Sequence, residues 1–166
     1  MSQMFYGCSA LTTVPQYNYV NVEDISQMFY NCNVMTTALD FSTATNLKVA
    51  DNPFYRCGVT TVTGIDANNL SMVGDRSQAW VLGGPVIETL EIDNLHDIIL
   101  DVRTNANLTA ASFEYIFTHA ASTAHRTTFI WVSQTQWDLI IYPNNYFELA
   151  NDRYNVNITV NDPRTS

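Results

Sequence analysis

The stretch MSQMFYGCSALTTV at residues 1–14 returns as ISQMFYNCNVMTTA at residues 25–38 and, shortened by one residue, as PFYRCGVTTV at residues 53–62. A degenerate fourth copy, AWVLG at residues 79–83, has a glycine where the cysteine stood. The first offset is 24 positions, and the second is 25. A period of this length is too short for a pair of helices and fits one strand with one compact turn. The sequence therefore predicts repeats near residues 1–24, 25–52, 53–76 and 77–104.

Equivalent side chains are expected to lie over one another when such repeats stack, because neighbouring strands are about 4.8 Å apart. The sequence predicts three interior columns, which are Phe5, Phe29, Phe54 and Trp80; Cys8, Cys32 and Cys57; and Leu11, Met35 and Val59. We interpret the cysteines as buried structural groups, because zinc sites usually use closely paired cysteines. Neither a metal nor another cofactor is expected.

The phrases MFYGCSALTTVP (residues 4–15) and VEDISQMFYNC (residues 22–32) resemble the bacterial surface-antigen (BspA-like) leucine-rich repeats, whose units read as an aromatic residue, a spaced cysteine, Leu-Thr and a strand. The resemblance covers residues 1–75 strongly and residues 76–102 weakly. It implies a leucine-rich-repeat solenoid, in which each repeat buries its apolar face only against its neighbours.

The second half of the chain replaces the repeat with alternating strands and helices. Apolar patterns predict strands over residues 86–92, 98–102, 128–132 and 155–160. Thr109 is the predicted N-cap of a helix that buries Phe113, Ile116, Phe117 and Ala120 on one face. Residues 137–142 fit either element, a break is expected at residues 143–145, and a short helix is expected over residues 146–153.

This tail, roughly residues 107–160, is similar to the terminal segment of repeat proteins in phage tails and gut-bacterial surface proteins. A stacked repeat needs a terminal unit that covers the apolar face of its last coil. We therefore predict a β-rich α/β fold: a leucine-rich-repeat solenoid over residues 1–104 that continues into a C-terminal α/β cap over residues 105–166.

Composition and charge exclude several partners. The chain has 7 basic and 16 acidic residues, and its net charge of −9 repels nucleic acid and anionic membranes. No apolar run approaches the roughly 18–20 residues that cross a bilayer, so membrane insertion is not expected. The first residues lack the pattern of a secretory signal. They also begin within a repeat, which favours a fragment of a longer chain over a first coil covered by a partner.

The most acidic stretch carries Glu88, Glu91, Asp93, Asp97 and Asp101. A carboxylate pair there would suit calcium or glycoside hydrolysis, but the spacing of a calcium loop is absent. A solvated strand edge is the preferred interpretation, since charge at an edge blocks unwanted pairing. The histidines, which are His96, His119 and His125, lack the helical spacing of a metal site.

Exposed aromatic residues are the best candidates for binding. Tyr17, Tyr19, Tyr142 and Tyr146 fall in predicted turns or loops near asparagines. Tyrosine with asparagine combines rigid contact area with adaptable hydrogen bonding, which suits glycans or protein partners. Packing of these rings against neighbouring coils is the alternative.

From the resemblance we expect a non-catalytic structural or binding module of a virion, such as a phage tail, fibre or decoration protein. Its expected partners are proteins of the particle or further copies of the chain, as a homo-oligomer, with a host-surface glycan as a further candidate. An adhesin-like module on a bacterial cell surface is the first alternative. A carbohydrate-active enzyme using Glu88, Glu91 or Asp93 is the second.

Overall fold

The computed structural model describes residues 1–70, 80–96, 98–120, 128–146 and 156–160. The chain folds as a mixed α/β structure with parallel sheets and few helices, which agrees with the predicted α/β class. The strands are β1 (Leu39–Asp40), β2 (Thr61–Asp66), β3 (Trp80–Val81), β4 (Thr89–Asp93), β5 (Ile99–Asp101), β6 (Thr128–Val132) and β7 (Val156–Val160). The helical segments are η1 (Ala67–Asn69), α1 (Ala110–Thr118), α2 (Gln134–Gln136) and η2 (Trp137–Ile141).

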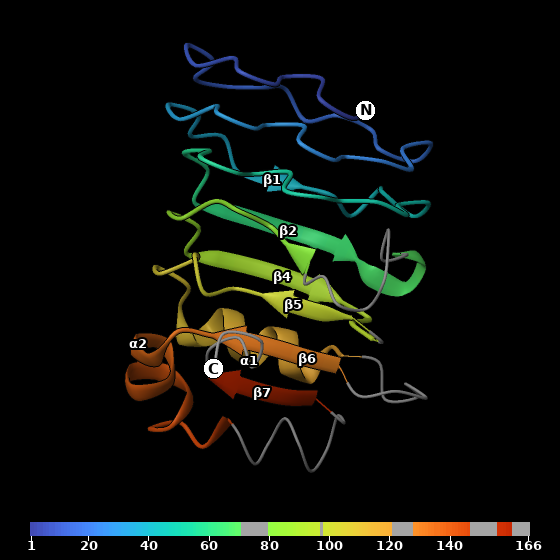
Figure 1. Cartoon of the computed structure of the whole chain (residues 1–166). Helices are drawn as coiled ribbons and strands as arrows, with labels where there is room; N and C mark the ends of the chain where they lie inside the picture. Colours follow the sequence, from blue (N-terminus) through green and yellow to red (C-terminus); the bar gives the residue numbers. More distant parts are fainter. Residues whose placement is uncertain (71–79, 97, 121–127, 147–155, 161–166) are drawn as a thin grey trace.

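Successive segments of the repeat region lie one above another, and we call each such segment a rung (Figure 1). The backbone amide of Phe5 donates to the carbonyl oxygen of Met28, and the amide of Phe29 donates to that of Pro53, both at 2.9 Å. Polar side chains keep the same offset, since Gln3 Nε2 donates to Gln27 Oε1 at 2.8 Å. Each copy of the repeat is therefore bonded directly to the next.

The MFYGC segments are runs of tight turns. Between the bonds that join rungs, the amide of Tyr6 returns to the carbonyl of Gln3, and the amide of Cys8 returns to that of Phe5, each at 3.1 Å. Gln3 and Gly7 have φ of 57° and 72°, which is the left-handed region that the third position of a type II turn requires. The same positive φ recurs in later rungs at Gln27, Asn31, Asn52 and Arg56.

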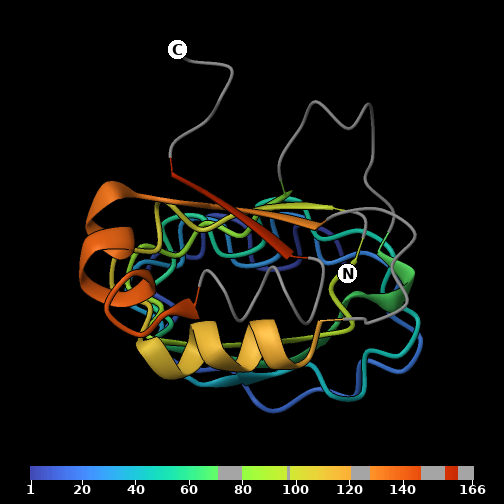
Figure 2. The same cartoon turned by 90° about the horizontal axis from the view of Figure 1, so that it is seen from below.

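Two parallel sheets line the stack. One has the order β1-β2-β4 and the other has the order β3-β5-β6-β7. Figure 2 shows α1 along one long side of the stack, with β6 and β7 along the opposite side. The residues in register are buried, which places one continuous core between the two sides. They are Leu39, Val62 and Leu90 in the first sheet, and Trp80, Leu100, Ile130 and Ile158 in the second.

Helix α1 occupies the place beyond β4 where another strand would continue the first sheet. The side chain of Thr109 accepts a hydrogen bond from the Ser112 amide, so the predicted N-cap is confirmed. Ser112 Oγ accepts from the Leu90 amide and donates to the Glu88 carbonyl, each at 3.0 Å. One serine hydroxyl thus satisfies the backbone edge of β4. The predicted apolar face is also buried, and it comprises Phe113, Ile116, Phe117 and Ala120.

The predicted strands at residues 128–132 and 155–160 are confirmed as β6 and β7. Residues 134–141, which include most of the ambiguous segment, form a helical turn of α2 and a π-helical turn of η2. A capping box between Ser133 and Gln136 begins this segment. Most of the helix predicted over residues 146–153 lies outside the described residues. Because β3, β5, β6 and β7 form one sheet, strands from both sides of residue 104 share a single core.

The fourth copy of the repeat has a different register from the predicted one. A parallel bridge pairs Phe54 with Gly83, so Trp80 does not extend the phenylalanine column. The indole Nε1 of Trp80 donates instead to the carbonyl oxygen of Ala50, at 2.6 Å. Gly83 has φ of 72°, and a Cβ added to it would lie 2.5 Å from the Cα of Tyr55. The two backbones approach too closely there for any side chain.

Candidate binding surfaces

The predicted phenylalanine column forms in the first three rungs. The rings of Phe5 and Phe29 stack with centroids 5.2 Å apart, and those of Phe29 and Phe54 stack 6.4 Å apart. Phe29 and Phe54 have no exposed surface, and Phe5 in the first rung is half-buried. Aromatic pairs in this arrangement add to the stabilisation from burial. The column therefore makes a rigid spine beneath the surface of the turns.

The predicted cysteine column is buried in two of its three members. Cys32 and Cys57 are buried, whereas Cys8 in the first rung is exposed. Burial raises the pKa of the Cys57 thiol to about 11, and burial also raises the pKa of Cys32. Nucleophilic attack and metal binding both require the thiolate, which burial disfavours here. In the described part of the chain, no cluster of histidine, cysteine and acidic side chains has the arrangement of a metal site.

A column of tyrosines runs along the outside of the same turns. The rings of Tyr6 and Tyr30 stack with centroids 4.8 Å apart, and those of Tyr30 and Tyr55 stack 4.7 Å apart. Tyr6 is 50% exposed, and the other two are half-buried. The guanidinium carbon of Arg56 lies 5.4 Å from the centre of the Tyr55 ring. Because stacking covers the ring faces between rungs, the column presents mainly ring edges and hydroxyls to solvent.

This tyrosine column was not among the surfaces predicted from the sequence, although the repeat contains the signal for it. Each strong copy has a tyrosine directly after the buried phenylalanine. A residue adjacent to a buried position in an extended or turn segment tends to point the other way. The recurrence of Phe-Tyr in all three copies therefore indicates an outer column beside the inner one.

The four tyrosines chosen from the sequence do not form one surface. Tyr19 is only 1% exposed, because its ring packs against Phe41 at 4.7 Å, and burial raises its pKa to about 12. Tyr146 is buried as well, and its hydroxyl donates to Glu114 Oε2 at 3.3 Å. The prediction that these two are exposed is wrong. Tyr17 is half-buried against Tyr19, and Tyr142 is exposed but follows η2, far along the chain.

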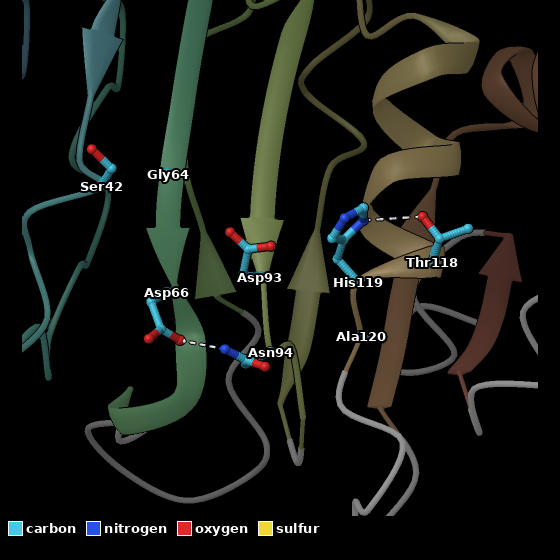
Figure 3. A pocket seen from close by; sticks show the side chains of 8 residues that line it. All are labelled: Ser42, Gly64, Asp66, Asp93, Asn94, Thr118, His119 and Ala120. Carbon is cyan, nitrogen blue, oxygen red and sulfur yellow. Dashed lines mark hydrogen bonds between the residues drawn. The ribbon is translucent and has the colours of Figure 1, made fainter.

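A polar depression of about 480 Å³ opens at the carboxyl ends of β2 and β4 and the end of α1. Figure 3 shows the residues that line it, which are Ser42, Gly64, Asp66, Asp93, Asn94, Thr118, His119 and Ala120. Asp66 and Asp93 are direct register partners on neighbouring strands. Asn94 Nδ2 donates to Asp66 Oδ1 at 3.0 Å, and the hydroxyl of Tyr115 donates to Asp93 Oδ1 at 3.0 Å.

His119 closes one side of the depression. Its ring stacks on Tyr115 with centroids 3.8 Å apart, and its Nδ1 lies 2.9 Å from the carbonyl oxygen of Tyr115. Nδ1 also lies 3.0 Å from the hydroxyl oxygen of Thr118, and in the tautomer that carries the proton on Nδ1 the other ring nitrogen, Nε2, is a hydrogen-bond acceptor. Partial burial, with the hydrogen bond to Asp93 as a second cause, raises the pKa of Tyr115 to about 12. Tyr115 thus stays a hydrogen-bond donor at neutral pH.

The acidic stretch is only partly the solvated edge that we expected. Glu88 is exposed, and Glu91 and Asp93 share the outer face of β4. Asp101, however, is buried and forms an ion pair with Arg103 at 2.7 Å, so the prediction that it is solvated is wrong. The guanidinium of Arg103 also covers the ring of Trp131, which explains how the charge is accommodated. Asp97 lies outside the described residues.

Of the three carboxylates considered for catalysis, Glu91 and Asp93 lie two positions apart on one face of β4, whereas Glu88 lies farther from Asp93. Glu88 and Asp93 stand five positions apart in extended chain, which separates their backbones by about 16 Å. Paired glycosidase carboxylates lie roughly 5–10 Å apart. Asp93 lines the depression, whereas Glu88 and Glu91 do not.

Comparisons with known proteins returned no significant match to a family model, to a curated protein or to a solved structure. Within the described residues, no helix combines the length and the apolar character needed to cross a bilayer. The chain is therefore assigned to a structural class by its own geometry: a mixed α/β protein with stacked parallel strands.

Proposed function

We propose that this chain is a leucine-rich-repeat solenoid of the BspA-like type with a C-terminal α/β cap. Hydrogen bonds between residues 24 positions apart support a solenoid, because they join equivalent residues of consecutive rungs. The register of Phe54 with Gly83 supports a fourth coil. The place of α1 beside β4 supports a cap, since Ser112 ends the hydrogen bonding of that sheet edge.

We further propose that the solenoid is a non-catalytic structural or binding module of a virion, in a tail, fibre or decoration protein, that contributes to assembly or host attachment. The tyrosine column of Tyr6, Tyr30 and Tyr55 carries this proposal. Its partly exposed rings stand on a rigid buried spine, so a partner would meet aromatic contacts at little cost in side-chain entropy. Tyrosine and arginine are also enriched where proteins bind one another.

Immunogold electron microscopy of particles and cells from the source organism tests the location. Antibodies raised against the purified chain should label tails, fibres or particle surfaces. Labelling confined to the bacterial cell envelope would replace the virion with the adhesin-like alternative. Hydrolysis of a host-surface polysaccharide that disappears in Glu91→Gln would establish the enzyme alternative.

A substitution test examines the tyrosine column itself. The triple variant Tyr6→Ser, Tyr30→Ser, Tyr55→Ser should lose attachment to the particle, or self-association in sedimentation, by at least tenfold. The matched control is Tyr142→Ser, which removes a tyrosine that is 73% exposed elsewhere on the chain. Equal binding by both variants would remove the column from the interaction surface.

A further inference from the structure

We infer that the polar depression at the ends of β2 and β4 is a binding site for a neutral saccharide. The inference rests on the host-attachment part of the proposed function and names a second surface, apart from the tyrosine column. A bulge lies at one side of the hollow. The register between β2 and β4 shifts between Val62 and Ile65, and Gly64 stands at this shift with φ of 70°. A Cβ at Gly64 would lie 2.5 Å from the amide nitrogen of Ser42, so the backbones of these two lining residues are in close contact.

The two aspartates that line the depression, Asp66 and Asp93, are placed where their charges destabilise the fold. Asp66 and Asp93 stand directly opposite each other on parallel strands, where like charges are destabilising. Neutral groups hold each carboxylate, since Asp66 Oδ1 accepts from Asn68 N and Asn94 Nδ2, and Asp93 Oδ1 accepts from the Tyr115 hydroxyl. In the part of the chain that the structure describes, these bonds leave the second oxygen of each carboxylate for a ligand.

The lining excludes most other ligand classes. Two carboxylates in a chain of net charge −9 repel anions. An apolar ligand would displace the water that hydrates the carboxylates and would offer them no hydrogen bonds in its place. A divalent cation needs several converging ligands, and no group of that kind is present among the described side chains.

A sugar ring fits the remaining chemistry. Its hydroxyls donate to the free oxygens of Asp66 and Asp93 in charge-assisted bonds, and to Nε2 of His119. Its oxygens accept from the side-chain amide of Asn94 and from the hydroxyl of Ser42, both of which line the hollow. The ring of His119, which lines the hollow (Figure 3) and is backed by the stacked ring of Tyr115, provides a flat wall beside these groups.

Isothermal titration of the whole chain with methyl glycosides of glucose, galactose, mannose and their N-acetylated amino sugars tests the inference. At least one glycoside should bind, and Asp66→Asn and Asp93→Asn should each weaken it by about tenfold or more, because each loses a charge-assisted bond. The matched control is Asp51→Asn, which changes an exposed aspartate outside the depression and should leave the affinity unchanged. Amide resonances of Asn94, Thr118 and His119 should shift on titration in the parent chain.

Three outcomes would overturn the site. They are no binding of any glycoside, binding that both depression variants retain, and binding that requires calcium and disappears with a chelator. Thermal melts of each variant identify any that fail to fold, and the resonance shifts in the parent chain then decide. Absence of sugar binding in the parent chain, with intact particle labelling, would refute this site alone, whereas intact sugar binding without particle labelling would refute the virion assignment alone.

Discussion

At the scale of single residues, Phe29 is the strongest test of the stacked columns. It is fully buried between Phe5 and Phe54. Phe29→Ala should lower the free energy of unfolding by about 3–5 kcal/mol, since a cavity replaces contacts on both ring faces. Urea denaturation followed by circular dichroism measures this loss. Phe129→Ala, at a position 38% exposed, should cost less than half as much; equal losses would mean that Phe29 is not held in a packed column.

Gly83 tests the corrected register of the fourth copy. Its φ of 72° and its approach to Tyr55 both forbid a side chain. Gly83→Ala should destabilise the chain by about 2–5 kcal/mol, which combines left-handed strain with overpacking. Gly7 is the matched control, because it also has φ of 72° but no atom within 4 Å of the added Cβ. Gly7→Ala should therefore cost only about 1–2 kcal/mol from strain. Similar thermal shifts for both variants would argue against the close approach.

The residue patterns also show why some sites were predicted and others were not. Phe5 and Phe29 occupy the same position of consecutive repeats, and Cys32 recurs at the same period in its own column. The stacking of the repeats therefore places the members of each column together. Trp80 matched the pattern by its aromatic character, but the pair Gly83-Gly84 allows a close backbone approach that shifts the register by three positions. Tyr19 was misplaced because residues near asparagines were assumed to be exposed. Its ring instead fills the space above Phe41 in the next rung, a contact that depends on three-dimensional packing.

At the scale of elements, the buried hydroxyl of Ser112 is one link between α1 and β4, in addition to the bond between Tyr115 and Asp93. Ser112 is 3% exposed, and it bonds both the Leu90 amide and the Glu88 carbonyl. Ser112→Ala should cost about 1–3 kcal/mol, because it leaves a buried backbone amide without a partner. Hydrogen exchange at Leu90 should accelerate in the same variant.

Thr118 provides the control for this junction. Among the described residues, its exposed hydroxyl bonds within the end of α1, to the carbonyls of Glu114 and Tyr115 and beside His119. Thr118→Ala should therefore change the stability by less than about 0.5 kcal/mol. If Ser112→Ala is equally mild, the helix does not depend on this hydroxyl for its place at the sheet edge.

Elements were predictable where a single period dominates. Residues 155–160 alternate cleanly, and residues 128–132 are rich in β-branched and aromatic residues; the strands β7 and β6 form there. The helix over residues 110–118 has a capping residue and an apolar face, and both were found in place. Residues 137–141 have no clean period, and they form a π-helical turn whose Leu139 is 70% exposed. The depression was not predictable, because residues from β2, β4 and the end of α1, which are separated in the sequence, line it together.

At the scale of the whole molecule, rungs are joined by side chains as well as by the backbone. At one corner, Asn46 Nδ2 donates to the carbonyl of Val20 at 2.7 Å, and Asn69 Nδ2 donates to that of Thr45 at 3.4 Å. These amides link neighbouring rungs in addition to the exposed ion pair of Lys48 with Glu23 at 2.8 Å, a kind of pair that contributes little to stability. Stability should therefore depend little on salt and strongly on the neutral interior.

That interior makes the fold sensitive to alkali. Burial raises the pKa of Cys57 from its ordinary 9.0 to about 11, so the folded state holds the thiol proton where the unfolded chain has lost it. The contribution of Cys57 to stability is fully present below pH 9, and it falls as the pH rises toward 11 by at most about 1.4 kcal/mol per unit. Urea unfolding at pH 8 and at pH 10.5, under reducing conditions, should show parent and Cys57→Ala converging as the pH rises. Cys8→Ala removes an exposed thiol from the same column and provides the control. A gap between parent and Cys57→Ala that stays constant with pH would mean that water reaches the thiol, and that the columns are not closed around it.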